Sequence, residues 1–105
     1  MIRVFLIDDH ALFRDGIRSL MSYQDDFEVV GEAGDADHGV PEAIKARPDI
    51  VLMDIDLPGG KDGIMATRQI SLALPETAVI MLTVHDDTEK LLSALKAGAQ
   101  GYLVK

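Results

Sequence analysis

The stretch Ile50-Val51-Leu52-Met53 is apolar at every position and runs directly into Asp54. A strand buried on both faces of a parallel sheet needs such a continuous apolar run, because helices cover both of its faces. Residues 2–7 and 79–82 are almost as uniformly apolar. The sequence therefore predicts a parallel sheet in which these three segments are buried strands.

Two further apolar runs, at residues 27–30 and 102–104, complete a set of five. The first of these is interrupted by Glu28 and followed by Glu32, which predicts an edge strand with one wetter side. The segments between the runs have helical character, and the order β-α-β-α-β-α-β-α-β predicts a doubly wound five-stranded α/β sheet with right-handed crossovers. No repeat, linker or low-complexity stretch divides residues 1–105, so we expect one domain.

Apolar stripes and punctuation mark the helices. Asp86 followed by Glu89 resembles a capping box, and Gly98 lies where a helix C-terminus favours a left-handed residue. Two stripes with helical spacing are expected to face the core, one made of Leu12, Phe13, Ile17, Leu20 and Met21 and the other of Leu91, Leu92 and Leu95.

The second helix, near residues 36–47, is poorly marked because it contains Gly39 and Pro41. Proline has no N–H to donate and suits only the first turn of a helix. We therefore expect this helix to start late, near Asp37 or His38, or to have an irregular first turn.

The composition of the chain disfavours several classes of function. Eighteen acidic and ten basic residues give a formal net charge of −8, and an acidic surface repels the phosphate backbone of DNA. The chain has no cysteine, so neither disulfides nor a thiolate metal site are available. The first apolar run is too short for a signal peptide or a membrane span, so we expect no membrane association and a cytoplasmic location.

Polar residues stand just past the ends of the predicted strands. Ligands of an open parallel sheet collect at the carboxyl ends of its strands, where the winding reverses. Three carboxylates, a hydroxyl and an ammonium are expected to meet there: Asp8, Asp9, Asp54, Thr83 and Lys105.

Each of these residues has an ordinary structural explanation when taken alone. An aspartate after a strand is usually a turn former or helix cap, a threonine on a strand is a good strand former, and a lysine is usually solvated. Three adjacent carboxylates, however, repel one another unless a hard cation such as Mg²⁺ is present. A carboxylate beside Mg²⁺ and a lysine is equipped for phosphoryl transfer, with Asp54 supplying the attacking oxygen. The G-x-S-x-G motif of serine hydrolases and the spacing of a glycine-rich phosphate loop are both absent from the sequence.

The motifs, taken together, resemble those of response regulator receiver domains over the whole chain. The matching segments are residues 7–10, 53–58, 62–63, 82–83 and 98–105, in the same order. The segment at residues 8–17 is similar to receivers of the NarL/FixJ (LuxR-type) class of transcription regulators. The resemblance implies a flavodoxin-like sheet with strand order 2-1-3-4-5, an order also given by the general rule for this kind of sheet.

The resemblance also implies residue roles in a two-component system. Asp54 would accept a phosphoryl group from a sensor histidine kinase. Asp9 would bind Mg²⁺ directly, Asp8 mainly through water, and the backbone carbonyl of Asp56 would complete the protein ligands together with Asp54. Lys105 and Thr83 would contact the phosphoryl group, and Tyr102 would swing inward behind Thr83 and so alter the surface around the fourth helix and fifth strand.

Two departures from the family pattern stand out. Residues 59–61 make the loop before Asp62-Gly63 one residue longer than usual, and the chain stops at Lys105. We therefore expect a receiver domain over residues 1–105 that lacks the fifth helix, with no helix-turn-helix domain through which to contact DNA. The apolar side chains of the third to fifth strands should then lie open on one face, which would favour a homodimer or a longer chain.

Two rival functions remain. Asp54-Ile55-Asp56 resembles the D-x-D motif of haloacid-dehalogenase-type phosphatases, in which Asp54 would be the nucleophile and Asp56 an acid/base. Those enzymes normally carry the motif after their first strand and are longer, so we favour a signalling switch over a turnover enzyme. A pseudo-receiver that no longer switches is disfavoured by the complete set of five site residues.

Overall fold

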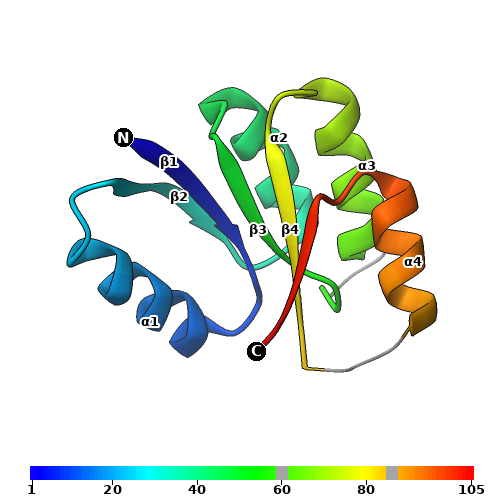
Figure 1. Ribbon diagram of the computed structural model, residues 1–105, viewed down its shortest axis with the longest axis horizontal. Helices are drawn as coiled ribbons and strands as arrows, with labels where there is room; N and C mark the ends of the chain where they lie inside the picture. The colour runs from blue at the N-terminus through cyan, green and yellow to red at the C-terminus, as the bar shows by residue number, and fades with distance from the viewer. Residues whose placement is uncertain (59–61, 85–87) are drawn as a thin grey trace.

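The computed structural model describes residues 1–58, 62–84 and 88–105 (Figure 1). In these residues strands and helices alternate in the predicted order: β1 (Ile2–Ile7), α1 (Ala11–Ser22), β2 (Phe27–Ala33), α2 (Ala36–Ala46), β3 (Ile50–Asp54), α3 (Gly63–Ala73), β4 (Ala78–Thr83), α4 (Thr88–Ala97) and β5 (Gly101–Val104). The strands form one parallel sheet in the order β2-β1-β3-β4-β5. The predicted fold class and strand order are confirmed, and in the described residues no helix follows β5.

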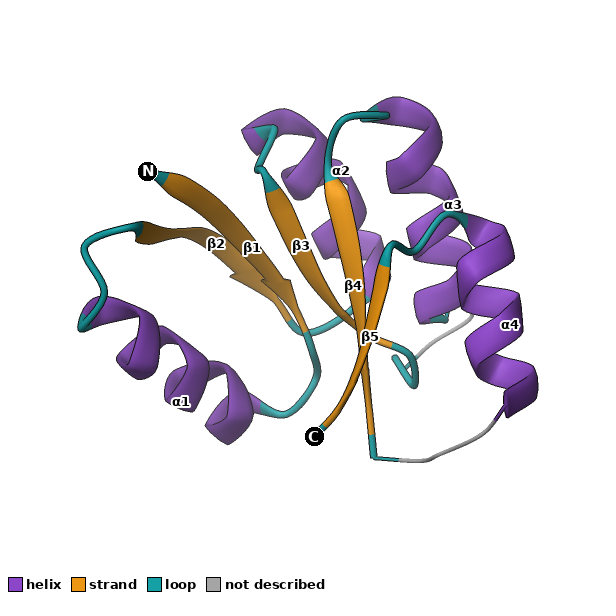
Figure 2. Cartoon of the chain, viewed as in Figure 1, coloured by secondary structure: helices purple, strands orange, loops and turns teal. Residues whose placement is uncertain are grey.

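The sheet separates two apolar layers (Figure 2). Phe5 and Ile7 of β1 point toward α2, α3 and α4 and join the larger core, whereas Val4 and Leu6 point toward α1. Successive side chains on a strand alternate between faces, so a strand with helices on both sides must be apolar at nearly every position. This explains why β1, β3 and β4 are continuous apolar runs.

Strand β2 lies at the edge of the sheet, as its glutamates predicted. Glu28 is exposed, and the strand continues to Ala33 beyond the apolar run. Its register with β1 shifts between Val4 and Phe5, where the ring of Phe5 lies so close to Gly31 that a Cβ there would come within 2.5 Å of it.

The expected late start of the second helix is wrong. Helix α2 begins at Ala36, where the Asp35 side chain caps it by accepting a hydrogen bond from the backbone N–H of His38 at 2.8 Å. The first turn is regular, since the Gly39 N–H donates to the Asp35 carbonyl at 3.0 Å. Pro41 therefore lies inside the helix, on its exposed side.

Packing against the sheet explains this helix better than its local preferences do. Gly39 is buried so close to Ile7 that a Cβ at this position would lie 2.9 Å from the Ile7 Cδ1 atom. Glycine therefore allows the helix to approach β1. The cost of Pro41, which removes one helical donor, is offset by the buried face that α2 presents to the sheet.

The predicted apolar stripes are wider than the faces that the helices bury. On α1, Phe13 packs against the sheet, but Leu12 and Leu20 are 86% and 66% exposed. On α4, small residues make the buried contact, including Ala94, and Leu95 remains 45% exposed. The capping box predicted at Asp86 and Glu89 includes a residue outside the described ranges, whereas Gly98 has the expected positive φ of 117°.

Of the third to fifth strands, only β5 has strongly exposed apolar side chains, which corrects the expectation for β3 and β4. Leu103, which pairs with Leu82 on the α1 side of the sheet, is 55% exposed, and Val104, on the other side, is 60% exposed. Leu52 of β3 and Leu82 of β4 are buried in the same cluster as residues of α1. Helix α1 therefore covers more of its face than we expected.

Candidate functional site

The ends of four strands bring the predicted residues to one edge of the sheet. Asp8 follows β1, Asp54 ends β3, Thr83 ends β4 and Lys105 follows β5. The Lys105 N–H donates to the Thr83 carbonyl at 2.7 Å, which fixes the last residue of the chain beside β4. Figure 1 shows the C-terminus at the same edge of the sheet as the connection from β1 to α1.

The ammonium of Lys105 lies between the two buried carboxylates. Its Nζ atom is 2.6 Å from Asp8 Oδ2 and 3.4 Å from Asp54 Oδ2. The contact with Asp8 is an ion pair in which the ammonium is not aligned for a hydrogen bond. Asp8 Oδ2 is buried and has no hydrogen-bond partner among the described residues. The same ammonium lies 4.7 Å from the ring centre of Phe13, so that one cation contacts side chains from α1, β3 and the end of β1.

Asp54 is buried, with 2% of its surface exposed. Burial raises the pKa of its carboxyl group to about 6, and the charge of Asp8 and a hydrogen bond with Asp9 add to the rise. The backbone N–H of Asp56, which donates to Asp54 Oδ1 at 3.1 Å, and the charge of Lys105 lower the pKa and only partly oppose it. The positive charge of Lys105 is therefore not enough to offset the cost of burying the Asp54 carboxylate.

This raised pKa gives the metal-free protein a distinctive pH dependence. The Asp54 pKa is about 6 in the folded state, against an ordinary value of 3.8. Between these two values the folded protein binds more protons than the unfolded chain does, so the contribution of Asp54 is present below pH 3.8 and lost as the pH rises through 6. At about 1.4 kcal/mol per pKa unit, the loss should be roughly 3 kcal/mol.

Urea unfolding in EDTA, at steps from pH 4 to pH 7, measures this contribution. The wild type should lose stability relative to Asp54→Asn as the pH rises, because the amide does not titrate. A constant difference between the two proteins across this range would contradict the prediction.

The remaining predicted residues surround this pair. The Asp9 side chain is 36% exposed and lies at the mouth of the cluster. Thr83 is buried, and Tyr102 is half-buried against the larger core. The Asp56 side chain accepts a hydrogen bond from the Nζ atom of Lys90, on α4, at 2.9 Å.

His10 was not predicted, yet it lies within this cluster. Its Nδ1 atom is 3.0 Å from Asp8 Oδ1, 3.5 Å from Asp9 Oδ1 and 3.7 Å from Asp54 Oδ2. The turn after β1 places it there, because the His10 N–H donates to Asp8 Oδ1 at 2.8 Å. Its position directly after two site aspartates was the signal available in the sequence.

Arg14 is a second residue that the sequence did not single out. Its guanidinium donates to the backbone carbonyl of Asp8 and, through Nε, to Glu32 Oε1 at 3.1 Å. Glu32 also pairs with Arg18 at 2.9 Å. These contacts hold α1, the edge strand β2 and the first residue of the site together.

The cluster fits a hard divalent cation. One ligand atom from each of four residues lies within 4.8 Å of the others: Asp8, Asp9, His10 and Asp54. Asp8 Oδ2, which is buried and is paired with Lys105 but has no hydrogen-bond partner among the described residues, could accept a contact from a cation or its water. Carboxylate oxygens are the ligands that Mg²⁺ prefers, and the chain thus has an acidic cluster typical of Mg²⁺ binding.

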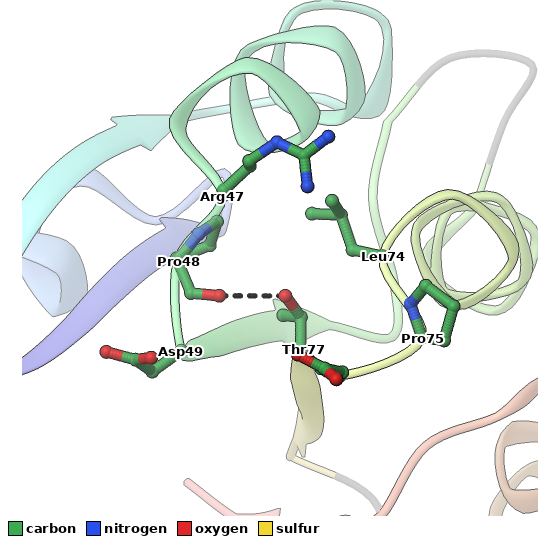
Figure 3. A pocket seen from close by; sticks show the side chains of 7 residues that line it. Arg47, Pro48, Asp49, Leu74, Pro75 and Thr77 are labelled. Carbon is green, nitrogen blue, oxygen red and sulfur yellow. Dashed lines mark hydrogen bonds between the residues drawn. The ribbon is translucent and has the colours of Figure 1, made fainter.

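A pocket elsewhere in the molecule is unrelated to this chemistry. It has a volume of about 370 Å³ and lies beside the residues that precede β3 and β4, at the opposite edge of the sheet (Figure 3). Thr77 closes one side by donating to the Pro48 carbonyl at 2.7 Å. Its lining residues do not include the converging carboxylates and lysine found at the strand ends near Asp54.

Comparison with known proteins defines the class. Residues 4–105 match the response regulator receiver domain, and this chain belongs to that family. Receiver domains of response regulators are signalling proteins that interact with histidine kinases, and they are not turnover enzymes.

Among individual relatives, the oxygen regulatory protein NreC of Staphylococcus epidermidis is 39% identical over 104 residues, covering 99% of this chain and 48% of NreC. The chain thus spans about half the length of such relatives. A two-component response regulator of the LuxR family from Aurantimonas sp. SI85-9A1 has a similar structure, with a TM-score of 0.92, 38% identity, and coverage of 100% of this chain and 74% of that one.

A second similar structure is the signal receiver domain of the putative response regulator NarL from Mycobacterium tuberculosis. It has a TM-score of 0.90 and 36% identity, and the match covers 98% of this chain and 82% of that one. The predicted resemblance to this class of regulators is confirmed. In the described part of the chain, no helix is long and apolar enough to cross a bilayer.

Proposed function

We propose that this domain is the phosphorylation switch of a two-component system, in which Asp54 accepts a phosphoryl group from a sensor histidine kinase. The observation that carries the proposal is the position of Lys105 Nζ, between the buried carboxylates of Asp8 and Asp54 at 2.6 and 3.4 Å. A cation held beside a buried carboxylate is suited to a reaction that brings further negative charge to that carboxylate.

The proposed reaction is a displacement at phosphorus. A carboxylate oxygen of Asp54 forms a new P–O bond while the bond from phosphorus to the donor's leaving group breaks, and the leaving group departs with the bonding electrons. Lys105 offsets charge on the transferred group. The Asp56 N–H, 3.1 Å from Asp54 Oδ1, orients the carboxylate. The same site would assist the later hydrolysis of the acyl phosphate.

The charge balance supports Mg²⁺ as the cofactor. The carboxylates of Asp8, Asp9 and Asp54 contribute −3 and Lys105 contributes +1, which leaves −2 for one Mg²⁺ to offset. Asp8, Asp9, Asp54 and the backbone carbonyl of Asp56 would hold the ion. When bound, it would supply positive charge to the oxygens of the transferred phosphoryl group.

Thr83 and Tyr102 are the proposed switch residues. Phosphorylation adds oxygen acceptors next to the end of β4, and the buried Thr83 hydroxyl is suited to donate to them. Tyr102 lies on β5, opposite Met81 of β4, and packs against the larger core. An inward movement of Tyr102 behind Thr83 would alter the surface formed by α4 and β5.

The output would be transcription control. The relatives that cover this chain include a LuxR-family response regulator and a protein named as an oxygen regulatory protein. With a formal charge of −8, this domain is poorly suited to hold DNA itself, so DNA contact would belong to a helix-turn-helix domain elsewhere in the whole protein. The kinase and the switch would meet in the cytoplasm.

Phosphorylation with a small donor separates this function from a phosphatase that uses Asp54 and Asp56. Intact mass after treatment with acetyl phosphate and Mg²⁺ should show one added phosphoryl group, followed by slow loss. Continuous, rapid release of inorganic phosphate from a simple phosphate ester, with no accumulated phosphoprotein, would instead favour the phosphatase.

A further inference from the structure

The imidazole of His10 gives this acidic cluster a nitrogen atom that carboxylate-based magnesium sites do not need. Its Nδ1 atom lies within 3.0 to 3.7 Å of one oxygen from each of Asp8, Asp9 and Asp54. The ring is 58% exposed, so it can adjust toward a bound ion without leaving a packed core. Neutral imidazole is a ligand for borderline metals such as Ni²⁺ and Zn²⁺, whereas carboxylate and water suit Mg²⁺.

We propose that His10 Nδ1 is a ligand of the cation at this site, and that the site consequently binds nickel-like divalent ions in preference to Mg²⁺. This inference rests on the proposed cation site of Asp8, Asp9 and Asp54, and adds to it the residue that determines which cation is bound. The buried Asp8 Oδ2 pairs with the Lys105 ammonium at 2.6 Å but has no hydrogen-bond partner among the described residues, so it can accept a further contact from a cation or its water.

The neighbours of Nδ1 show that its lone pair can face the site. The Lys105 ammonium lies 2.9 Å from it and can only donate, so this contact is a hydrogen bond when Nδ1 carries no proton. Asp8 Oδ1, at 3.0 Å, can only accept when ionised, so the two contacts are alternatives. The form of the ring that accepts from Lys105 is also the form that ligates a metal.

His38 provides an internal contrast. Its Nδ1 atom lies 2.8 Å from Asp35 Oδ1, as short a contact as any that His10 makes. However, the ion pair of His38 is with a single residue, Asp35, and its side chain is 77% exposed. Among the residues that the structure describes, the group of side chains able to hold a metal ion includes His10 and not His38.

Calorimetric titration of the untagged protein with Ni²⁺ and with Mg²⁺ tests the inference. Wild type should bind Ni²⁺ more tightly than Mg²⁺. His10→Ala should lower the ratio of Ni²⁺ affinity to Mg²⁺ affinity at least about tenfold. Even the loss of a residue that only supports a metal ligand typically lowers metal affinity by about that factor. His38→Ala/His85→Ala, which leaves His10 as the only histidine of the sequence, should keep the wild-type ratio. Asp9→Ala should weaken the binding of both cations, which would show that both bind at the same site.

An unchanged ratio in His10→Ala, or a ratio lost in the double variant, would overturn the role of His10. Mg²⁺-dependent phosphorylation of Asp54 in the same samples separates this failure from failure of the proposed function. If phosphorylation persists while the ratio is unchanged, only the role of His10 is wrong. If His10→Ala neither binds Mg²⁺ nor is phosphorylated, a second variant is needed. His10→Gln keeps a polar side chain and should restore phosphorylation but not the preference for Ni²⁺. A restored preference for Ni²⁺ in His10→Gln would overturn the inference.

Discussion

Asp54→Asn should abolish phosphorylation by acetyl phosphate in the presence of Mg²⁺, leaving no added phosphoryl group in the intact mass. The substitution keeps the size and shape of a side chain that is 2% exposed, so the core around it should persist. It removes the nucleophilic carboxylate oxygen and the negative charge that faces Lys105 Nζ at 3.4 Å. An amide is a far weaker nucleophile toward phosphorus than a carboxylate, which makes complete loss the expected result.

Asp56→Asn is the matched control, because it makes the same chemical change two residues away. The Asp56 side chain pairs with Lys90 at 2.9 Å, and its backbone N–H to Asp54 is unaffected by the substitution. The receiver mechanism predicts that Asp56→Asn still gains one phosphoryl group. The phosphatase mechanism gives Asp56 the acid/base role and predicts a severe loss instead. Labelling of Asp54→Asn to the wild-type extent would rule out Asp54 as the acceptor.

Gly63→Ala should destabilise the domain severely, since there is no space for a side chain at the start of α3. A Cβ atom at Gly63 would lie 2.1 Å from the Asp54 carbonyl oxygen and 2.8 Å from the Ile55 Cα atom. Both are backbone atoms and cannot turn away as the end of a flexible side chain could. The loss in the free energy of unfolding should be at least about 3 kcal/mol, the upper part of the usual range for overpacking.

Gly16→Ala is the control for this substitution. Gly16 lies within α1 and has nothing within 4 Å of the position that a Cβ would take. Alanine should therefore stabilise the helix by about 0.5–1 kcal/mol, as in an exposed helix interior. Urea unfolding of the two variants measures both effects. A Gly63→Ala protein as stable as wild type would mean that α3 can retreat from β3 at little cost.

The sheet was predictable because its strands satisfy a simple physical demand. Burial on both faces requires continuous apolar runs, and β1, β3 and β4 have them; the glutamates of β2 likewise marked an edge. The start of α2 was not predictable, because local rules for proline and glycine omit the contact between Gly39 and Ile7. The predicted core-facing stripes on α1 and α4 included residues that are exposed in the structure. Periodicity shows where a helix is apolar but not how much of that surface the sheet can cover.

The meeting of the site residues was also predictable, because parallel strands end at one edge. Asp8, Asp54 and Lys105 lie together for that reason. His10 and Arg14 were missed because side-chain direction after a strand depends on the turn. The hydrogen bond from the His10 N–H to Asp8 Oδ1 turns the imidazole back over the strand ends. No periodic pattern of residues encodes such a local geometry.

The position of Lys105 also has a consequence for the order of β5. This strand is short, pairs only with β4, and has two outer apolar residues in contact with solvent, so it should fray more readily than its neighbours. The ammonium of Lys105 opposes this fraying by holding the last residue against carboxylates on two other strands. Because one of these two ion pairs is with Asp54, we expect a change of charge at Asp54 to alter how readily the end of β5 separates from β4.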